Sequence, residues 1–127
     1  KTTWDHASYT PDVIVINLGT NDLATARGAK PALTREDYIG AYRAFLERLN
    51  GLHPDAKIIV AIGPMEFGPI PEWLSDLAKA HEDVFYFKFE PRKKKKYFGG
   101  NWHPSVAMHR VMADALVEKI RKITDWD

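Results

Sequence analysis

A compact polar segment, Gly19-Thr20-Asn21-Asp22, directly follows the apolar run of residues 13–18. A glycine lets the backbone approach a ligand closely or adopt a positive φ. The Asn21 side chain offers an uncharged amide donor, which suits the stabilisation of a developing oxyanion. The alternative is an ordinary turn or helix cap, since Asn and Asp are common in both, and we interpret Asp22 as such a cap. The segment therefore indicates either an oxyanion site or a structural turn.

A second polar segment, Asn101-Trp102-His103-Pro104-Ser105, precedes a long stretch of helical periodicity. The residue before a proline disfavours helix, whereas Pro104 and Ser105 are typical of a helix start. We therefore expect His103 in a loop, where an imidazole can act as a general base. The alternative is a capping histidine. His109 falls in the apolar stripe of the following helix, and we expect it to be packed or half-buried.

Other reactive groups are few. The chain has no Cys, which removes thiolate nucleophiles and thiolate metal ligands. No His-x-x-x-His pair or carboxylate-rich spacing indicates a metal site, and we expect neither a metal nor another cofactor. We expect His6, His53 and His81 at the surface. None of the serines has the strand–turn–helix setting that exposes a catalytic hydroxyl; they are Ser8, Ser75 and Ser105.

The elements that must position these segments alternate along the chain. Residues 13–18, 57–62 and 84–89 are apolar runs that predict buried strands. Residues 34–50, 71–81 and 105–123 have the apolar spacing of helices. This alternation predicts an α/β fold with a parallel sheet, whose ligands bind beyond the carboxyl ends of the strands. In the last helix, the residues expected to face inward are Val106, His109, Met112, Ala113, Leu116, Ile120 and Ile123.

The two polar segments resemble those of a known family. The block from Pro11 to Asp22 resembles the Gly-x-Asn-Asp block of SGNH (GDSL-type) hydrolases. The segment from Trp102 to Ser105 is similar to their final histidine block. Together with Gly63-Pro64-Met65, both blocks resemble more narrowly carbohydrate esterase family 2, the acetyl-xylan-esterase-like deacetylases. The resemblance covers residues 4–123 and implies a three-layer α/β/α, flavodoxin-like fold with a parallel sheet.

The resemblance also implies roles for individual residues. Asn21 would donate its side-chain amide to the oxyanion, and Gly19 would shape that loop. His103 would take the proton from a serine nucleophile and return it to the leaving alcohol. Trp102 would form part of the substrate cleft as an apolar platform for a sugar; the alternative for this residue is core packing.

Two features depart from the family pattern. The family's serine lies in an N-terminal Gly-Asp-Ser block, and an oxyanion glycine lies in a second block; neither block occurs in this sequence. We therefore expect residues 1–127 to be the C-terminal portion of one catalytic domain without its N-terminal strands. The carboxylate that orients the family's histidine is also absent, because Gly100 and Asn101 stand in its place. Asn101 can only accept a hydrogen bond from the ring, and Glu90 is a distant substitute.

The expected function is a serine-type esterase that removes O-acetyl groups from plant polysaccharides or sugars. Two alternatives stay open: a catalytically inactive carbohydrate-binding module, and a related esterase or lipase that acts on another acyl ester. The expected partners are the acetylated carbohydrate and the N-terminal segment of the same domain, as a separate or cleaved chain. The resemblance implies a secreted or cell-surface location.

One cluster of like charge, from Arg92 to Lys96, interrupts an otherwise mixed distribution. It indicates either a contact with an acidic polysaccharide or anionic surface at the rim of the cleft, or a solvated loop. The whole chain has 18 basic and 17 acidic residues, so its net charge of +1 argues against a nucleic-acid partner. No apolar run approaches the roughly 18 residues of a membrane span, and we expect no membrane partner.

Overall fold

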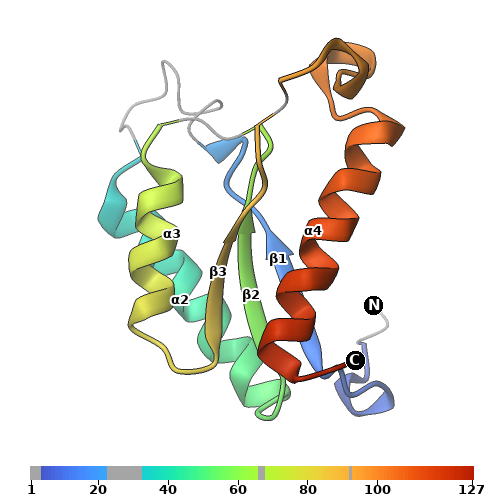
Figure 1. Ribbon diagram of the computed structural model, residues 1–127. Helices are drawn as coiled ribbons and strands as arrows, with labels where there is room; N and C mark the ends of the chain where they lie inside the picture. Colours follow the sequence, from blue (N-terminus) through green and yellow to red (C-terminus); the bar gives the residue numbers. More distant parts are fainter. Residues whose placement is uncertain (1–3, 23–32, 66–67, 92) are drawn as a thin grey trace.

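In a computed structural model, the protein is described over residues 4–22, 33–65, 68–91 and 93–127 (Figure 1). Strands β1 (Val13–Asn17), β2 (Lys57–Ile62) and β3 (Val84–Lys88) form a parallel sheet in the order β1-β2-β3. Helices α2 (Arg35–Leu52) and α3 (Ile70–Lys79) lie on one face of the sheet, and α4 (Val106–Thr124) lies on the other. The predicted three-layer α/β architecture with a parallel sheet is therefore confirmed.

Strand β2 forms the centre of the protein. Its residues Ile58 to Ile62 are all nearly inaccessible to solvent, because strands flank both of its edges and helices cover both of its faces. The parallel register places Val60 opposite Ile16 on one side and opposite Tyr86 on the other. A continuous apolar run is typical of a strand covered on both faces, which is why the sequence predicts it well.

The sheet separates two apolar clusters. The larger cluster lies under α2 and α3, and its buried members include Tyr38, Ile39, Tyr42, Leu46, Ile70, Leu74 and Leu77. The smaller cluster lies under α4 and is built from Ile59, Ala61 and Phe89, with Met112, Leu116, Ile120 and Ile123 packed against them. The helices are therefore held mainly by apolar contact with the sheet, since burial of apolar surface is the dominant favourable term in folding.

Helix α2 begins where the sequence predicts. The Thr34 hydroxyl accepts a hydrogen bond from the Asp37 N–H at 3.1 Å, and Glu36 and Asp37 place negative charge in the first turn. The helix continues to Leu52, two residues beyond its predicted end. None of the described helices is both long and apolar enough to cross a membrane.

Helix α4 follows the predicted inward stripe at Met112, Leu116, Ile120 and Ile123 but departs from it in its first part. Val106, His109 and Ala113 were expected to face inward, and all three are exposed, Val106 by 83%. Met108, outside the predicted stripe, is only 2% exposed. The prediction is wrong for this first part of the helix because the packing of α4 against the sheet cluster is made by Met112 and the later residues of the stripe. The Ser105 hydroxyl caps the first turn by accepting a hydrogen bond from the Met108 N–H at 3.2 Å.

Candidate active site

A cavity of about 360 Å³ lies at the carboxyl ends of β1 and β2. Asn21, from the loop after β1, and His103, from the loop before α4, both line it. Residues 63–65, at the end of β2, form another wall. The two polar segments, far apart in the sequence, therefore meet at one site. The other residues that line this cavity are Asn17, Thr20, Pro104, His109 and Met112.

A side-chain hydrogen bond joins the ends of β1 and β2 beside this cavity. The Asn17 Nδ2 donates to the carbonyl of Gly63 at 3.2 Å. Gly63 has a φ of +99°, a conformation that favours glycine. The bond satisfies a carbonyl that has left the sheet, and it holds two walls of the cavity together.

Gly19 is needed in the loop before Asn21 for two physical reasons. Its φ is +116°, and a Cβ at this position would lie 2.5 Å from the Tyr38 hydroxyl and 3.0 Å from Ile70 Cγ2. The Tyr38 hydroxyl itself donates to the Leu18 carbonyl at 3.4 Å. The ring of Tyr38, fixed in the core, therefore supports the backbone of this loop at close range.

Two buried tyrosines lie behind the same loop. Burial raises the pKa of Tyr38 and of Tyr42 well above the ordinary range, and the negative charge of Asp22 raises both further. The Tyr42 hydroxyl is buried and has no hydrogen-bond partner among the described residues. The Asp22 N–H donates to the Gly19 carbonyl at 3.3 Å; whether Asp22 also caps a helix depends on residues 23–32, which lie outside the described residues.

The loop that bears His103 is closed by backbone hydrogen bonds. The His103 N–H donates to the Gly100 carbonyl at 3.0 Å, and the Gly99 N–H donates to the His103 carbonyl at 2.7 Å. A Cβ on Gly99 would meet the His103 carbonyl oxygen at 3.2 Å, so the two backbones are closely packed. The predicted loop position of His103 is confirmed. Its side chain is exposed at the cavity, where an imidazole can exchange protons.

Ser105 anchors this loop to α4. Its hydroxyl accepts the Met108 N–H at 3.2 Å and donates to the Lys96 carbonyl at 2.6 Å. The side-chain cap of α4 is therefore Ser105 and not His103, which leaves the imidazole available for chemistry.

Asn101 and Trp102 both have left-handed backbones, with φ of +53° and +63°. Asn tolerates this conformation, whereas a bulky aromatic residue rarely adopts it. The Trp102 side chain is 73% exposed, and its ring meets Phe98 edge-to-face at 5.8 Å. The alternative of core packing for Trp102 is therefore wrong. Neither Asn101 nor Trp102 is among the residues that line the cavity with Asn21 and His103.

His109 is the residue of this site that sequence reasoning missed. It lines the cavity together with His103, although its spacing in α4 predicted packing against the core. Its N–H donates to the Ser105 carbonyl at 2.9 Å, one turn into the helix. The position of His109, one helical turn after the loop that bears His103, is the sequence signal that could have indicated its place in the site. The described lining of the site thus holds two imidazoles, His103 and His109, and two amides, Asn17 and Asn21.

None of the described serines lines the cavity. The Ser8 hydroxyl donates to the Asp5 carbonyl at 2.6 Å, before β1 begins, and Ser105 is engaged as a cap. Ser75 lies within α3. Among the described residues, no group of three His, Asp or Glu side chains could hold a metal ion. The described part of the cavity therefore presents imidazole and amide side chains.

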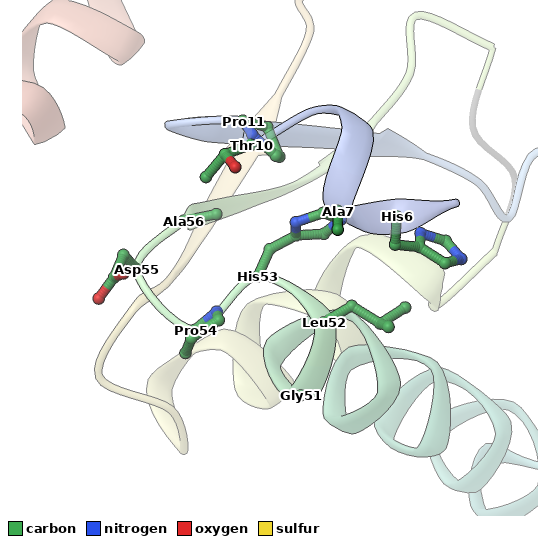
Figure 2. Close-up of a pocket in the computed structure, with 10 residues that line it drawn as sticks. All are labelled: His6, Ala7, Thr10, Pro11, Gly51, Leu52, His53, Pro54, Asp55 and Ala56. Carbon is green, nitrogen blue, oxygen red and sulfur yellow. The ribbon is translucent and has the colours of Figure 1, made fainter. Parts of the chain in front are cut away.

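A larger cavity of about 420 Å³ lies at the opposite end of the sheet, between the first residues of the chain and the α2–β2 connection (Figure 2). The rings of His6 and His53 are 5.9 Å apart there. Both residues, and His81, are half-buried and therefore less exposed than predicted. Figure 2 shows the Asp55 carboxylate pointing away from both rings. Ligands of parallel sheets bind at the carboxyl ends of the strands, which favours the cavity of Asn21 and His103.

A parallel sheet between helices, with an amide and an imidazole at the carboxyl ends of its strands, defines an SGNH-type hydrolase arrangement. The GDSL-like lipase/acylhydrolase family model matches residues 2–111, and the chain belongs to this family.

The relatives that the chain matches are carbohydrate esterases. It is 31% identical over 132 residues to the cellulase/esterase CelE of Acetivibrio thermocellus, covering 97% of this chain and 16% of that protein. It is 30% identical over 127 residues to an acetylxylan esterase / glucomannan deacetylase of Cellvibrio japonicus, covering 97% and 34%. A family two carbohydrate esterase from Clostridium thermocellum, solved in complex with cellohexaose, superposes with a TM-score of 0.81 at 29% identity over 98% of this chain and 39% of that one. The resemblance to this family is confirmed, and the chain spans well under half the length of each relative.

Proposed function

We propose that this chain provides the histidine base and an amide oxyanion donor of a serine-type carbohydrate esterase that removes O-acetyl groups from plant polysaccharides or sugars. The observation that supports this most is that Asn21 and His103 line one cavity at the carboxyl edge of the sheet. Its volume of about 360 Å³ lies in the range of small-molecule sites, roughly 300–1,000 Å³. The names of the relatives support an ester substrate.

The proposed reaction uses the two residues in sequence. His103 takes the proton of a serine hydroxyl as its oxygen attacks the acetyl carbonyl, and the Asn21 amide donates to the oxyanion that forms. His103 then gives the proton to the sugar oxygen, which leaves as an alcohol. A water molecule, deprotonated by the same imidazole, then attacks the acetyl-enzyme, and the imidazolium returns that proton to the serine oxygen as acetic acid leaves. This cycle requires no metal or organic cofactor.

The serine nucleophile is proposed to come from another segment of the same domain that pairs with the outer edge of β1. An apolar groove of about 290 Å³ runs beside this edge, lined by residues 14–18 together with Phe45 and Leu49. Val15 and Leu18 are 40% and 54% exposed there, although they belong to an apolar strand and its extension. An open, apolar strand edge is a template for pairing, and the carboxyl end of this strand leads directly to Asn21.

Two further assignments belong to this proposal. Asn101 would orient the imidazole only weakly, because an amide cannot stabilise an imidazolium by charge. The exposed ring of Trp102 would carry a sugar residue outside the cavity. A secreted or cell-surface location fits substrates that are themselves extracellular polymers.

The test compares ester turnover by variants of the full-length protein that contains this chain. We expect His103→Ala to lower kcat for 4-nitrophenyl acetate and acetylated xylan by about 10³-fold or more. We expect Asn21→Ala to lower kcat by about 10²–10³-fold. His6→Ala, in the cavity at the opposite end of the sheet, is the matched control and should retain turnover. Full turnover by His103→Ala would overturn the proposal.

A carbohydrate-binding module without catalysis is the second candidate. It is favoured by the part of the cavity lining that the structure describes, where no carboxylate stands to orient His103. A cello-oligosaccharide occupies a solved relative. This candidate predicts that a glycan binds, that Trp102→Ala abolishes binding, and that no form of the protein turns over an ester.

A further inference from the structure

The positive charge of this protein is concentrated beside the proposed catalytic loop. Lys93 to Lys96 provide four of the 18 basic residues, so the remaining 14 face 17 acidic residues and the rest of the chain is net acidic. Arg92 precedes them in the sequence and lies outside the described residues. Elsewhere basic and acidic residues are mixed with a small acidic excess, so this segment is where the chain would attract a polyanion most strongly.

The lysine segment is tied to the loop that bears His103. Residues 95–97 form a short 3-10 turn, in which the Tyr97 N–H donates to the Lys94 carbonyl at 2.9 Å. The Ser105 hydroxyl donates to the Lys96 carbonyl at 2.6 Å, and the Ser105 N–H donates to the Tyr97 carbonyl at 3.0 Å. These bonds fix the backbone of the segment to Ser105, which lies two residues after His103 in the sequence. A freely solvated loop would lack such bonds.

The charges of this segment face solvent. All four lysine side chains are exposed, and the ion pairs among the described residues involve other cations, Arg35, Lys57 and Lys79. The Lys96 ammonium lies 5.2 Å from the centre of the Tyr97 ring, which leaves its charge intact. The ammonium groups are thus available to an external anion at the edge of the active site.

We propose that Lys93 to Lys96 bind the carboxylates of a uronate-bearing polysaccharide, so that the substrate class of this site is an acetylated polymer with uronic acid groups. The acetyl ester is neutral and gives a charged segment nothing to recognise, whereas glucuronate or galacturonate residues place isolated carboxylates along the same polymer. Flexible ammonium groups suit such carboxylates because they act as point charges without a fixed geometry. The substrate part of this inference rests on the proposed esterase function, whereas the binding part does not.

The experiment separates binding from turnover in the full-length protein. Binding is measured by affinity electrophoresis and calorimetry with glucuronoxylan, with the same xylan after reduction of its carboxyl groups, with polygalacturonate, and with duplex DNA. The test variant is K93Q/K94Q/K95Q, which keeps Lys96 beside Tyr97. The matched control is R43Q/R48Q/K122Q, which also removes three exposed positive charges, two from α2 and one from α4. Turnover of 4-nitrophenyl acetate reports on the catalytic residues alone.

We expect the wild type and the control variant to bind glucuronoxylan about tenfold more tightly than the carboxyl-reduced polymer at about 20 mM salt. The difference should nearly vanish at about 500 mM salt. K93Q/K94Q/K95Q should lose the preference and keep turnover of the nitrophenyl ester. Binding of polygalacturonate as tight as that of glucuronoxylan would support recognition of both glucuronate and galacturonate polymers.

Three outcomes would overturn the inference: equal binding of the charged and reduced polymers by the wild type, an unchanged preference in the triple variant, or tighter binding of DNA than of either uronate polymer. If the wild type binds uronates but turns over no ester, the charge inference stands and the proposed esterase function fails.

Discussion

Replacing Gly19 by alanine tests whether the loop that bears Asn21 depends on its glycine. The backbone there has a φ of +116°, and the added carbon would lie 2.5 Å from the Tyr38 hydroxyl and 3.0 Å from Ile70 Cγ2. Both neighbours belong to the core, where side chains have little freedom to move. The substitution must therefore strain the backbone, displace the loop, or both.

The two effects of Gly19→Ala can be estimated separately. A non-glycine residue held in a sparsely populated backbone region costs about 1–3 kcal/mol. An extra carbon in a closely packed position costs about 1–3 kcal/mol more. We therefore expect the free energy of unfolding to fall by about 2–6 kcal/mol. Because Asn21 lies two residues further on, we also expect a lower kcat for any ester substrate.

Urea denaturation of four variants measures this effect, one of them Tyr38→Phe alone. Gly40→Ala is the matched control, because its Cβ on α2 would meet no atom within 4 Å. In a helix, that change should raise stability by about 0.5–1 kcal/mol. The third variant combines Gly19→Ala with Tyr38→Phe, which removes the oxygen nearest the added carbon. We expect it to recover about 1 kcal/mol relative to the sum of the single changes.

The reasoning is refuted if Gly19→Ala unfolds at the same urea concentration as the wild type, or if it stabilises the protein as Gly40→Ala does. A double variant that recovers nothing would show that the Tyr38 hydroxyl is not the source of the clash.

Four further variants follow from the same structure. Ser105→Ala removes the cap of α4 and the bond to Lys96, so we expect a loss of about 1–2 kcal/mol in unfolding free energy and a lower kcat; Thr34→Ala, which caps α2, should lose about 1 kcal/mol with kcat unchanged. Burial raises the pKa of Tyr42 above its ordinary value, so the unfolded chain ionises first as the pH rises. Wild-type stability should therefore fall above about pH 10, by up to about 1.4 kcal/mol per pH unit for this group, and urea denaturation across that range should show a smaller fall for Tyr42→Phe. Trp102→Ala should raise KM for a polymeric substrate and leave turnover of 4-nitrophenyl acetate unchanged, as steady-state kinetics would show.

Local patterns in the sequence predicted most of the fold. Strand β2 is an unbroken apolar run, and its burial on both faces follows directly from that composition. The Thr34 cap and the acidic first turn of α2 gave its start correctly. Element ends were less well predicted, since the final turn of a helix depends on bonds such as that from the His53 N–H to the Leu49 carbonyl at 2.8 Å.

Helix α4 shows why a periodic stripe alone does not place a site residue. The stripe through Val106, His109 and Ala113 has correct helical spacing, yet Met108 is the buried residue. Each residue of an α-helix is rotated by about 100° from the one before it, so a stripe that is shifted by one residue faces a different direction. The choice between such stripes is made by packing against the sheet, where Met112, Leu116, Ile120 and Ile123 meet Ile59, Ala61 and Phe89.

The sequence by itself determined the class of fold, the chemical types of the site residues and the family to which they belong, because strand composition and motif spacing are local properties of the chain. Only the tertiary structure decided that Asn21 and His103 share one cavity, that His109 joins them, and that the lysine segment is anchored beside the base. Those facts depend on parallel pairing of the strands and on hydrogen bonds between residues far apart in sequence, such as Asn17 and Gly63. Such contacts exist only once the chain has closed on itself.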